Sequence, residues 1–366
     1  MKARHHTKKR SGPETARSRP IKSTVDTETA AAPPRNQDSH AEPLVLPPWQ
    51  AAVRNAVRDP EELARLLDLP LGTFDALCGD AFPLLVPRGF VARMRRGDPN
   101  DPLLLQVLPV PAEREPAEGF STDPVREQGL AARGLIRKYA GRALLIASAT
   151  CPVHCRYCFR RDFPYSEQLA ARNGWEPALA ELRAHDDVRE VILSGGDPLS
   201  LSNRRLQELL AKLAETGAAT VRIHTRFPIV VPERIDAELL RLLAASPLRI
   251  VVVVHGNHPN ELDDTVAVAL AGLRRSVDAL LNQSVLLAGV NDDVATLAAL
   301  SERLFACSVL PYYLHALDPV RGAARFEVAE QRGIELVASL RARLPGYLVP
   351  RFVREIPGEL SKTPLG

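Results

Sequence analysis

The stretch EVILSGGDPLSLSNRRLQELLAKLAETGAATVRIHT, residues 190–225, decides the fold. It begins and ends with a short apolar run, and between these runs leucines recur at the spacing of an amphipathic helix. A strand, a helix and a second strand predict one β-α-β unit with parallel strands. Together with these two, similar apolar runs make six possible strands along the chain, the others being 143–148, 249–256, 282–288 and 308–315. The pattern predicts an α/β protein with a parallel sheet.

Polar side chains gather where these predicted strands end. They are Ser194, His224, Thr225, His255, Asn257, His258 and His315. Barrel enzymes keep their chemistry at the carboxyl ends of their strands. This distribution therefore favours a partial (β/α)6 barrel of the TIM type with one active rim. The alternative is an open, doubly wound sheet with its crevice at one switch point.

The chain before the predicted barrel divides into distinct parts. Residues 49–78 place apolar side chains at helical spacing, and Asp59-Pro60-Glu61-Glu62 is typical of a helix start. Residues 97–125 are rich in turn residues and predict an extended linker. We expect a helical region and linker over 43–125, the barrel over 126–345 and a C-terminal segment over 346–366.

The first 42 residues form a basic tail. Nine lysines and arginines against five acids give 9 − 5 = +4, whereas the whole chain carries +3, so the remainder carries −1. The tail has few large apolar residues, which predicts disorder. We interpret it as a solvated extension, with attachment to RNA or to the ribosome as the alternative role. The folded part shows no pattern for nucleic-acid readout, so no direct nucleic-acid partner is expected.

Composition places the protein in a reducing compartment. The 366 residues are 45% hydrophobic, with no apolar run long enough for a membrane span and no signal-peptide core near the start. These features predict a cytoplasmic protein that does not bind membranes. Five cysteines, three of them clustered, favour thiolate ligands over a disulfide framework. Cys78 and Cys307 stand alone and are interpreted as packing residues.

The clustered cysteines lie in CPVHCRYCFRR, residues 151–161, directly after the first predicted strand of the barrel. Zinc with His154 as fourth ligand is one possibility, although structural zinc sites usually take ligand pairs from separate segments. The other is an iron–sulfur cluster, which thiolates hold. A four-iron cluster held by only three cysteines leaves one iron open to a substrate or cofactor.

The spacing CxxxCxxC at Cys151, Cys155 and Cys158 resembles that of the radical S-adenosylmethionine (SAM) superfamily. The resemblance implies a 4Fe-4S cluster whose open iron binds SAM, and reductive cleavage of SAM to a 5′-deoxyadenosyl radical. Seven ordered motifs are similar to those of lysine 2,3-aminomutases. They are KYAGRALLIASATCPVHCRYCFRR, ILSGGDPL, RFPIVVPERI, HGNHPNEL, NQSVLLAGVND, PYYLHALD and SKTPL. Four stretches look most like the branch that makes β-lysine for elongation factor P: LVPRGF, GDPNDPLL, GFSTDP and PYYLHALDPVRGAARF.

This resemblance also implies pyridoxal 5′-phosphate (PLP) as a cofactor, with Lys362 as the lysine that binds it covalently. A lysine desolvated in such a site becomes nucleophilic at neutral pH. Lys138 and Arg142 match positions that bind the PLP phosphate. Arg160 matches the position that binds the substrate carboxylate, for which a planar guanidinium is suited.

The remaining implied site residues serve the substrate side chain and SAM. Asp318 and Glu355 match the positions that bind the ammonium of a lysine substrate. The SGGD motif resembles the one that holds the SAM amino group, and His255 and Gln283 match positions near the cofactors. The residues of the motif are Ser194, Gly195, Gly196 and Asp197.

The implied function is the conversion of L-lysine to β-lysine, with the R form expected, for the modification of elongation factor P through a lysyl-tRNA-synthetase-like ligase. The chain ends four residues after Lys362, which favours a monomer or dimer. A catabolic lysine 2,3-aminomutase that makes free β-lysine is the nearest alternative. A zinc-binding module and a radical SAM enzyme without PLP are the others.

Overall fold

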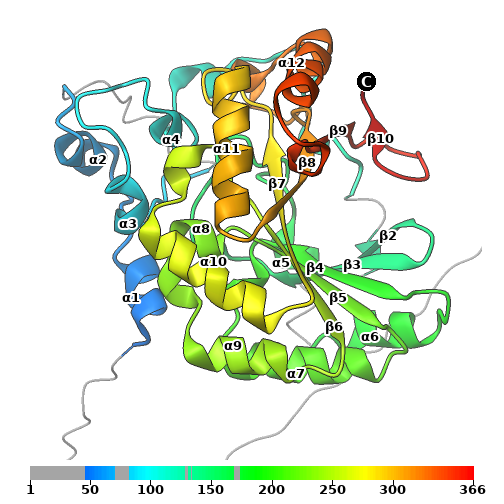
Figure 1. Ribbon diagram of the computed structural model, residues 1–366. Helices are drawn as coiled ribbons and strands as arrows, with labels where there is room; N and C mark the ends of the chain where they lie inside the picture. The colour runs from blue at the N-terminus through cyan, green and yellow to red at the C-terminus, as the bar shows by residue number, and fades with distance from the viewer. Residues whose placement is uncertain (1–45, 71–81, 128–130, 133, 169–173) are drawn as a thin grey trace, which may run out of the picture. The chain divides into compact units, whose positions relative to one another are not determined.

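The computed structural model describes residues 46–70, 82–127, 131–132, 134–168 and 174–366. The predicted tail and Cys78 lie outside these residues. The described chain is built on a sheet in which β1 to β10 lie in the order of the sequence (Figure 1). The strands are β1 (Ala131–Ala132), β2 (Leu135–Tyr139), β3 (Arg142–Ser148), β4 (Glu190–Gly195), β5 (Thr220–Thr225), β6 (Arg249–Val254), β7 (Ala279–Val285), β8 (Leu310–His315), β9 (Arg351–Arg354) and β10 (Thr363–Pro364).

The sheet is parallel from β3 to β9. Antiparallel strands flank it, with β1 and β2 at one end and β10 at the other. All six predicted strands are present, and the expected α/β partial barrel is confirmed. The strand predicted at 282–288 lies three residues earlier, as β7, because the polar run Asn282-Gln283-Ser284 is inside the strand and not before it.

Helices connect the strands and cover the outer side of the sheet. Figure 1 shows α7, α9 and α10 side by side below and beside β4 to β6. The α-helices are α1 (Pro48–Arg54), α2 (Pro60–Leu66), α3 (Arg88–Val91), α4 (Pro102–Leu105), α5 (Tyr165–Gln168), α6 (Glu176–Arg183), α7 (Asn203–Ala214), α8 (Phe227–Val230), α9 (Ala237–Ala244), α10 (Asp264–Ser276), α11 (Val294–Ala306) and α12 (Glu330–Arg343). Short 3₁₀ turns are η1 (Pro111–Arg114), η3 (Pro198–Ser200), η4 (Pro232–Arg234), η5 (Pro259–Glu261), η6 (Ala324–Phe326) and η7 (Gly346–Leu348).

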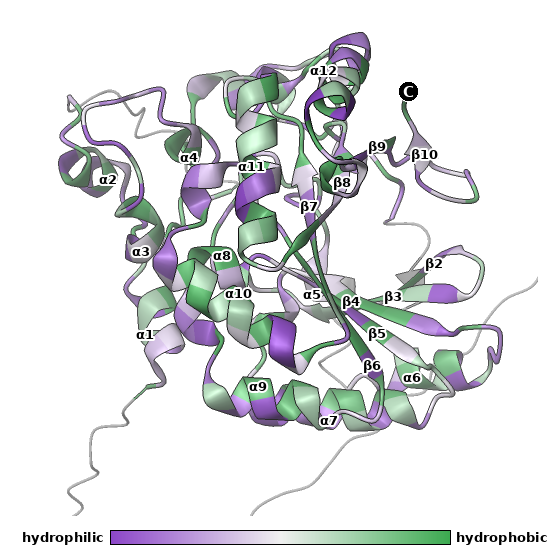
Figure 2. Cartoon of the chain, in the orientation of Figure 1, coloured by the Kyte–Doolittle hydropathy of each residue, from purple (hydrophilic) through white to green (hydrophobic). Residues whose placement is uncertain are grey.

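Four of the connecting helices begin at a polar residue that accepts a backbone hydrogen bond. Ser202 starts α7, Asp236 starts α9, Asp263 starts α10 and Asp293 starts α11, each with its side chain on a backbone N–H of the first turn. Such caps satisfy N–H groups that have no partner within the helix. Figure 2 shows apolar segments alternating with polar bands along α7, α9 and α10, as expected for helices with one buried face.

The two faces of the sheet differ in chemistry. Val191, Leu193, Val221 and Ile223 are fully buried in one apolar cluster with leucines of α7 and α9. Because successive side chains of a strand point to opposite faces, the residues between them point to the inner side of the barrel. Toward the carboxyl ends of the strands, Ser194, His224, His255 and Gln283 lie on that side, while Glu190 and Arg222 lie on it closer to the amino ends. The interior of the barrel is therefore polar toward its carboxyl rim.

The N-terminal helical region packs on the barrel. Trp49 of α1 is buried, with its ring edge-on to Phe227 at 5.7 Å between centroids. The predicted helix start at Asp59 is confirmed, since its carboxylate accepts from the backbone N–H groups of Glu61 and Glu62 at the start of α2. The predicted linker contains α4 and η1, and Ser121 forms a backbone bridge with Val320.

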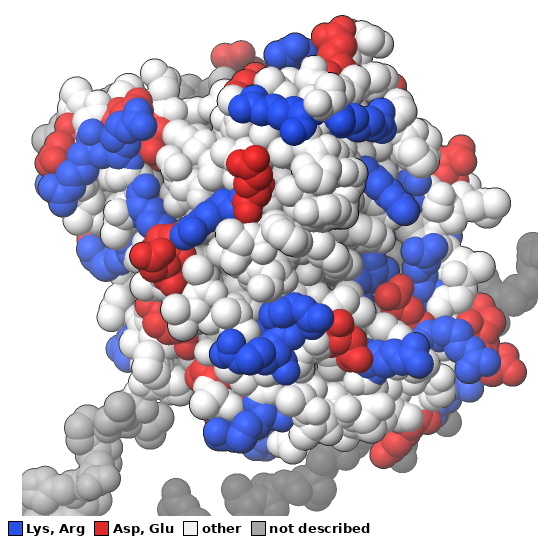
Figure 3. Space-filling model, in the orientation of Figure 1, with Lys and Arg blue, Asp and Glu red and all other residues white. Residues whose placement is uncertain are grey.

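The described surface mixes charges of both signs. On the face shown in Figure 3, basic and acidic side chains lie beside one another and no block of a single sign covers it. One exposed ion pair joins Arg303 to Asp264 at 3.4 Å. No helix of the described residues is long and apolar enough to cross a membrane.

Candidate functional site

The three clustered cysteines lie on the loop that follows β3. All three are free thiols and partly exposed. Burial first, and then the neighbouring Cys155, raise the pKa of Cys158 to about 11. The pKa of Cys151 is raised in the same way, by burial first and then by Cys158. The thiols therefore lie close enough to disfavour each other's charge, and a bound cationic centre would be needed to hold them as thiolates.

This donor set fits an iron–sulfur cluster, which takes thiolate ligands and accepts an incomplete set of cysteines. Among the described residues, no group of three or more His, Cys, Asp or Glu side chains is arranged to hold a single metal ion. His154, the possible fourth zinc ligand, has its Nδ1 at 2.8 Å from the carbonyl oxygen of Pro83 and its ring stacked on Phe82. That ring is held by the N-terminal region.

The glycine pair at the end of β4 packs directly against the start of the cysteine loop. Gly195 has φ +116°, a conformation that side chains rarely adopt. A Cβ atom on it would lie 2.5 Å from the carbonyl oxygen of Ser148, and one on Gly196 would lie 2.4 Å from that of Thr150. The glycines are thus required by contact with the protein's own backbone. Their predicted contact with SAM remains a prediction.

Asp197 is buried beside this glycine pair. Its carboxylate accepts from the hydroxyl of Thr225 at 2.7 Å, the backbone N–H of Arg226 at 2.7 Å and that of Leu199 at 3.0 Å. Burial raises its pKa to about 6, because the loss of water outweighs these hydrogen bonds. The residue joins β4 to β5 at the rim, and a bond to the SAM amino group would add to contacts already present.

His255, directly after β6, and Gln283 of β7 are brought together as neighbours. The side-chain amide of Gln283 lies 2.8 Å from Nε2 of His255. Burial first, and then Arg226 and Arg160, lower the pKa of His255 to about 3, so the ring is neutral at physiological pH. His224 lies 5.9 Å away between ring centroids. This pair places a neutral, polar patch on the inner side of the barrel.

Arg160 is buried and bonds to Glu127, a residue that the sequence did not single out. Its Nε donates to Glu127 Oε2 at 2.6 Å and its Nη2 to Oε1 at 2.9 Å, while Nη1 donates to Ser194 Oγ at 2.8 Å. Lys138 lies 3.3 Å from the same carboxylate. Glu127 thus connects the predicted carboxylate-binding arginine to the predicted phosphate-binding lysine.

Glu355 is the centre of a second charged group. Its Oε2 accepts from Lys362 Nζ at 2.8 Å, and its Oε1 accepts from Lys138 Nζ at 3.2 Å and the hydroxyl of Tyr139 at 2.6 Å. Burial alone would raise the pKa of Glu355, but Lys362 and Lys138 outweigh burial and lower it to about 2. The carboxylate follows β9 and its partners lie on β2 and beside β10, so it joins the two ends of the open sheet.

Asp318 belongs to the same group of charges. It follows β8 and is partly accessible to solvent. Burial raises its pKa to about 6, while the ammonium of Lys362 acts in the opposite direction. Arg142 lies at the start of β3, with its guanidinium carbon 5.1 Å from the ring centroid of Tyr139. The structure therefore gathers Lys362, Asp318, Glu355 and Lys138 at one place.

Several residues of this rim were not predicted as site residues. Glu127 and Tyr139 belong to no motif that identifies them, and their contacts join segments far apart in the sequence. His315 stands in PYYLHALD and has a buried Nε2 for which the described residues offer no hydrogen-bond partner. Burial lowers its pKa well below the usual value, and Lys362 adds to this effect. Its position at the end of a predicted strand was the one feature of the sequence that could have indicated this histidine as a site residue.

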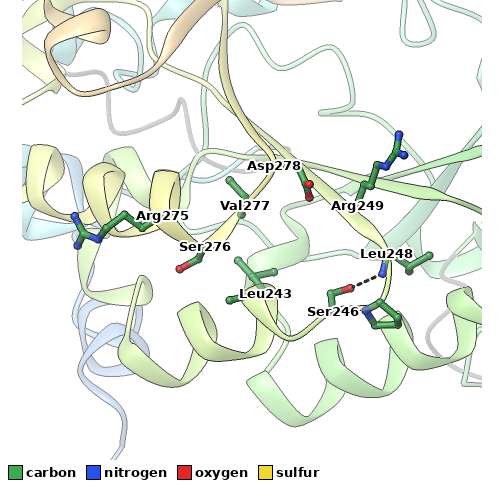
Figure 4. Close-up of a pocket in the computed structure, with 10 residues that line it drawn as sticks. Leu243, Ser246, Leu248, Arg249, Arg275, Ser276, Val277 and Asp278 are labelled. Atoms are coloured by element: carbon green, nitrogen blue, oxygen red, sulfur yellow. Dashed lines mark hydrogen bonds between the residues drawn. The ribbon is translucent and has the colours of Figure 1, made fainter.

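A hollow elsewhere on the molecule does not belong to this site. It has a volume of about 390 Å³ and lies between the C-terminal ends of α9 and α10 and the starts of β6 and β7. Its lining includes Arg249, Arg275 and Asp278. Figure 4 shows the two arginines pointing away from each other, so they do not converge on one point. The hollow is at the amino ends of the strands, opposite the cysteine loop.

Comparison with known proteins gives a match for the cysteine-bearing half of the barrel. A family model described as a 4Fe-4S single cluster domain matches residues 140–265. Among solved structures, a radical SAM methyltransferase from Sphaerobacter thermophilus covers 60% of this chain and 68% of its own, at TM-score 0.43 and 18% identity. That structural likeness is too low to carry an argument. The family match supports the iron–sulfur interpretation of the cysteine loop.

Curated proteins named L-lysine 2,3-aminomutase align with most of the chain. The one from Escherichia coli (strain K12) is 48% identical over 87% of this chain and 94% of its own length. The one from Haemophilus influenzae is 44% identical over 86% of this chain and 94% of its own length. The one from Clostridium subterminale is 34% identical over 87% of this chain and 77% of its own length.

Proposed function

Because this chain belongs to the L-lysine 2,3-aminomutase family, we propose that it converts L-lysine to β-lysine by moving the α-amino group to the neighbouring carbon. The observation that carries the proposal is the pair of carboxylates, Asp318 and Glu355, that act on the ammonium of Lys362. Glu355 bonds this ammonium at 2.8 Å and Asp318 is near enough for its pKa to respond to it, so the place has the charge required by the side chain of a lysine substrate.

The cysteine loop is proposed to hold a 4Fe-4S cluster with SAM at its open iron. When bound, this pair supplies the radical that removes a hydrogen atom from the substrate. The protein's part is to hold three thiolates and to exclude water. Asp197 and the glycine pair keep β4, β5 and the cysteine loop in contact through the distances given above. His255 is held neutral beside Gln283, so it adds no charge near the reacting carbon.

PLP is proposed as the second cofactor, with Lys362 binding it covalently and Lys138 and Arg142 binding its phosphate. When bound, PLP supplies a conjugated system that delocalises the unpaired electron during the nitrogen migration. The fit rests on one side chain in particular: the Lys362 amine is at the rim, three-quarters buried, among groups of both signs. Lys138 has two carboxylates as present partners, and a phosphate would have to share this lysine with them.

Arg160 is proposed to bind the carboxylate of the substrate. Glu127 holds the guanidinium by two parallel hydrogen bonds, which restricts its plane. A guanidinium has more N–H donors than the three bonds present use, so donors remain for a second carboxylate. The substrate would then be held at both ends, by Arg160 at its carboxylate and by Asp318 and Glu355 at its ammonium.

The finer assignment is to the branch that makes (R)-β-lysine, for transfer to elongation factor P by a lysyl-tRNA-synthetase-like ligase. The motifs LVPRGF, GDPNDPLL and GFSTDP support this branch over the catabolic alternative. The handedness of the product separates the two. A cytoplasmic location, a monomeric or dimeric state and the domain limits at 42, 125 and 345 stay predictions.

The test is anaerobic turnover. Reconstituted protein with PLP, SAM, dithionite and L-lysine is expected to form β-lysine, identified and assigned R or S by chiral mass spectrometry. Cys155→Ala and Lys362→Ala should form none, whereas Cys307→Ala, a change at a buried cysteine away from the loop, should retain activity. A reconstituted wild type that leaves lysine unchanged contradicts the proposal, and activity in Lys362→Ala contradicts the PLP part alone.

A further inference from the structure

Two arginines of the cysteine loop are buried and share one acid. Arg156 stands between Cys155 and Cys158, and Arg161 follows the third cysteine by three residues. Their side chains are 1% and 9% exposed. Buried cations are costly unless a charged partner is near them. The nearest carboxylate to both is Glu113 of η1, in the linker before the barrel.

The geometry around Glu113 is that of a clamp. Arg156 Nε donates to Glu113 Oε1 at 2.8 Å and its Nη2 to Oε2 at 2.5 Å, two parallel bonds to one carboxylate. Arg161 Nη2 donates to the same Oε2 at 2.8 Å. Arg325 lies 3.9 Å from Oε1 on a third side. One carboxylate with a side-chain exposure of 6% thus faces three guanidinium groups.

Three hydrogen bonds to backbone carbonyls of the segment before the barrel add to this clamp at the middle of the loop. The N–H of Arg156 donates to the carbonyl oxygen of Gln106 at 2.8 Å, and its Nη1 donates to that of Phe82 at 2.7 Å. The N–H of His154 donates to the carbonyl oxygen of Leu85 at 3.0 Å. The segment before the barrel therefore holds the cysteine loop from outside, and Glu113 supplies the negative charge in this contact.

We propose that Glu113 is a positioning residue of the metal centre, which holds the cysteine loop through Arg156 and Arg161 and makes the surroundings of the cluster less positive. The inference rests on the cluster part of the proposed function and not on the lysine part. The residue touches neither ligand nor substrate. Its effect reaches the cluster through the two arginines and through the charge that it carries in a water-poor region.

The sign of the expected effect follows from the charge. A cluster becomes more negative when it takes up an electron, so a nearby negative charge makes reduction harder and a nearby positive charge makes it easier. Removing the charge of Glu113 should shift the midpoint potential to less negative values. Removing the charge of Arg161 should shift it to more negative values. A purely structural role would not produce opposite signs.

The experiment is a redox titration of the reconstituted protein, followed by electron paramagnetic resonance, without SAM or lysine. Glu113→Gln, Arg161→Gln and the wild type are compared, with iron and sulfide counted per folded chain. Glu190→Gln is the matched control, because Glu190 bonds Arg222 at 2.7 Å at the opposite end of the barrel. The expected result is opposite shifts for the first two variants and none for the control.

Loss of iron from Glu113→Gln with a native circular dichroism spectrum also supports the proposal, because the loop then no longer holds the cluster. Should Glu113→Gln fail to fold, Arg161→Gln decides the matter, since it leaves the bond between Arg156 and Glu113 in place. Potentials equal to that of the wild type, or shifts of the same sign in both variants, overturn the proposal. Because β-lysine is not measured, failure here leaves the proposed reaction untouched.

Discussion

At the scale of single residues, Glu355 shows how a charge is retained where water is scarce. Burial disfavours its carboxylate, but three donors from two other parts of the chain compensate, and the pKa falls to about 2. A buried acid with two cationic partners is stabilised only while all three groups stay charged. The residue is therefore a point at which pH acts on stability.

Glu355→Gln should reduce the dependence of stability on acid. The folded pKa lies below the ordinary value of 4.5, so the contribution of Glu355 is fully present above that value and is lost as pH falls through about 2. This shift corresponds to a contribution on the order of 3 kcal/mol near neutral pH. We expect the difference in unfolding free energy between wild type and variant to shrink from pH 6 to pH 3, as measured by chemical denaturation. A difference that stays constant over this range would show that the charge does not matter.

At the scale of elements, much of the barrel could be predicted from the sequence. The strands β3 to β6 and β8 are apolar runs with helices between them, and such periodicity depends on neighbours in the sequence. The strand β9 was not predicted because four residues, RFVR, show no distinct pattern. The contacts of Glu127 and Glu113 could not be predicted either, since they join segments that only the folded chain brings together.

The glycine pair provides a test at this scale. Gly196→Ala should lower the unfolding free energy by about 1–3 kcal/mol, because the new methyl group meets the backbone of Thr150, at the start of the cysteine loop. Iron content after reconstitution should fall with it. Gly346→Ala is the control, because a Cβ atom there has no neighbour within 4 Å. Thermal unfolding and iron analysis are the measurements, and equal values for both variants would contradict the expected packing.

At the scale of the whole described molecule, the sheet remains open and its two ends are joined by side chains. Lys138 on β2 bonds Glu355 after β9, and the same ammonium lies 3.3 Å from Glu127. Because Lys138 Nζ also donates to the carbonyl oxygen of Val125 at 3.1 Å, the end of the N-terminal linker, the first strands and the C-terminal hairpin meet at one lysine. Backbone pairing does not connect the two ends of the sheet, since the strand order runs from β1 to β10 without closing.

Lys138→Met should loosen the C-terminal hairpin while the central strands stay protected. It removes the cation shared by two buried carboxylates, each of which keeps one other cationic partner, so the expected loss is about 1–3 kcal/mol. Hydrogen exchange measured by mass spectrometry should become faster in β9 and β10 and remain unchanged in β5 and β6. Lys212→Met is the control. It removes an ammonium that is one-third exposed and 3.5 Å from Glu208, so hydrogen exchange should change in none of these strands. Unchanged exchange at β9 would refute the role of Lys138.

The bond between Lys362 and Glu355 has a mechanical consequence. Any ligand that takes up the Lys362 amine removes one of the three donors from Glu355 and leaves the two that belong to β2. Glu355 would stay bound to β2, but the arm of the hairpin that carries the lysine would be held to β9 chiefly by the short backbone pairing of β10 with β9. Binding of a ligand at the Lys362 amine would in this way make β10, at one edge of the sheet, less firmly held.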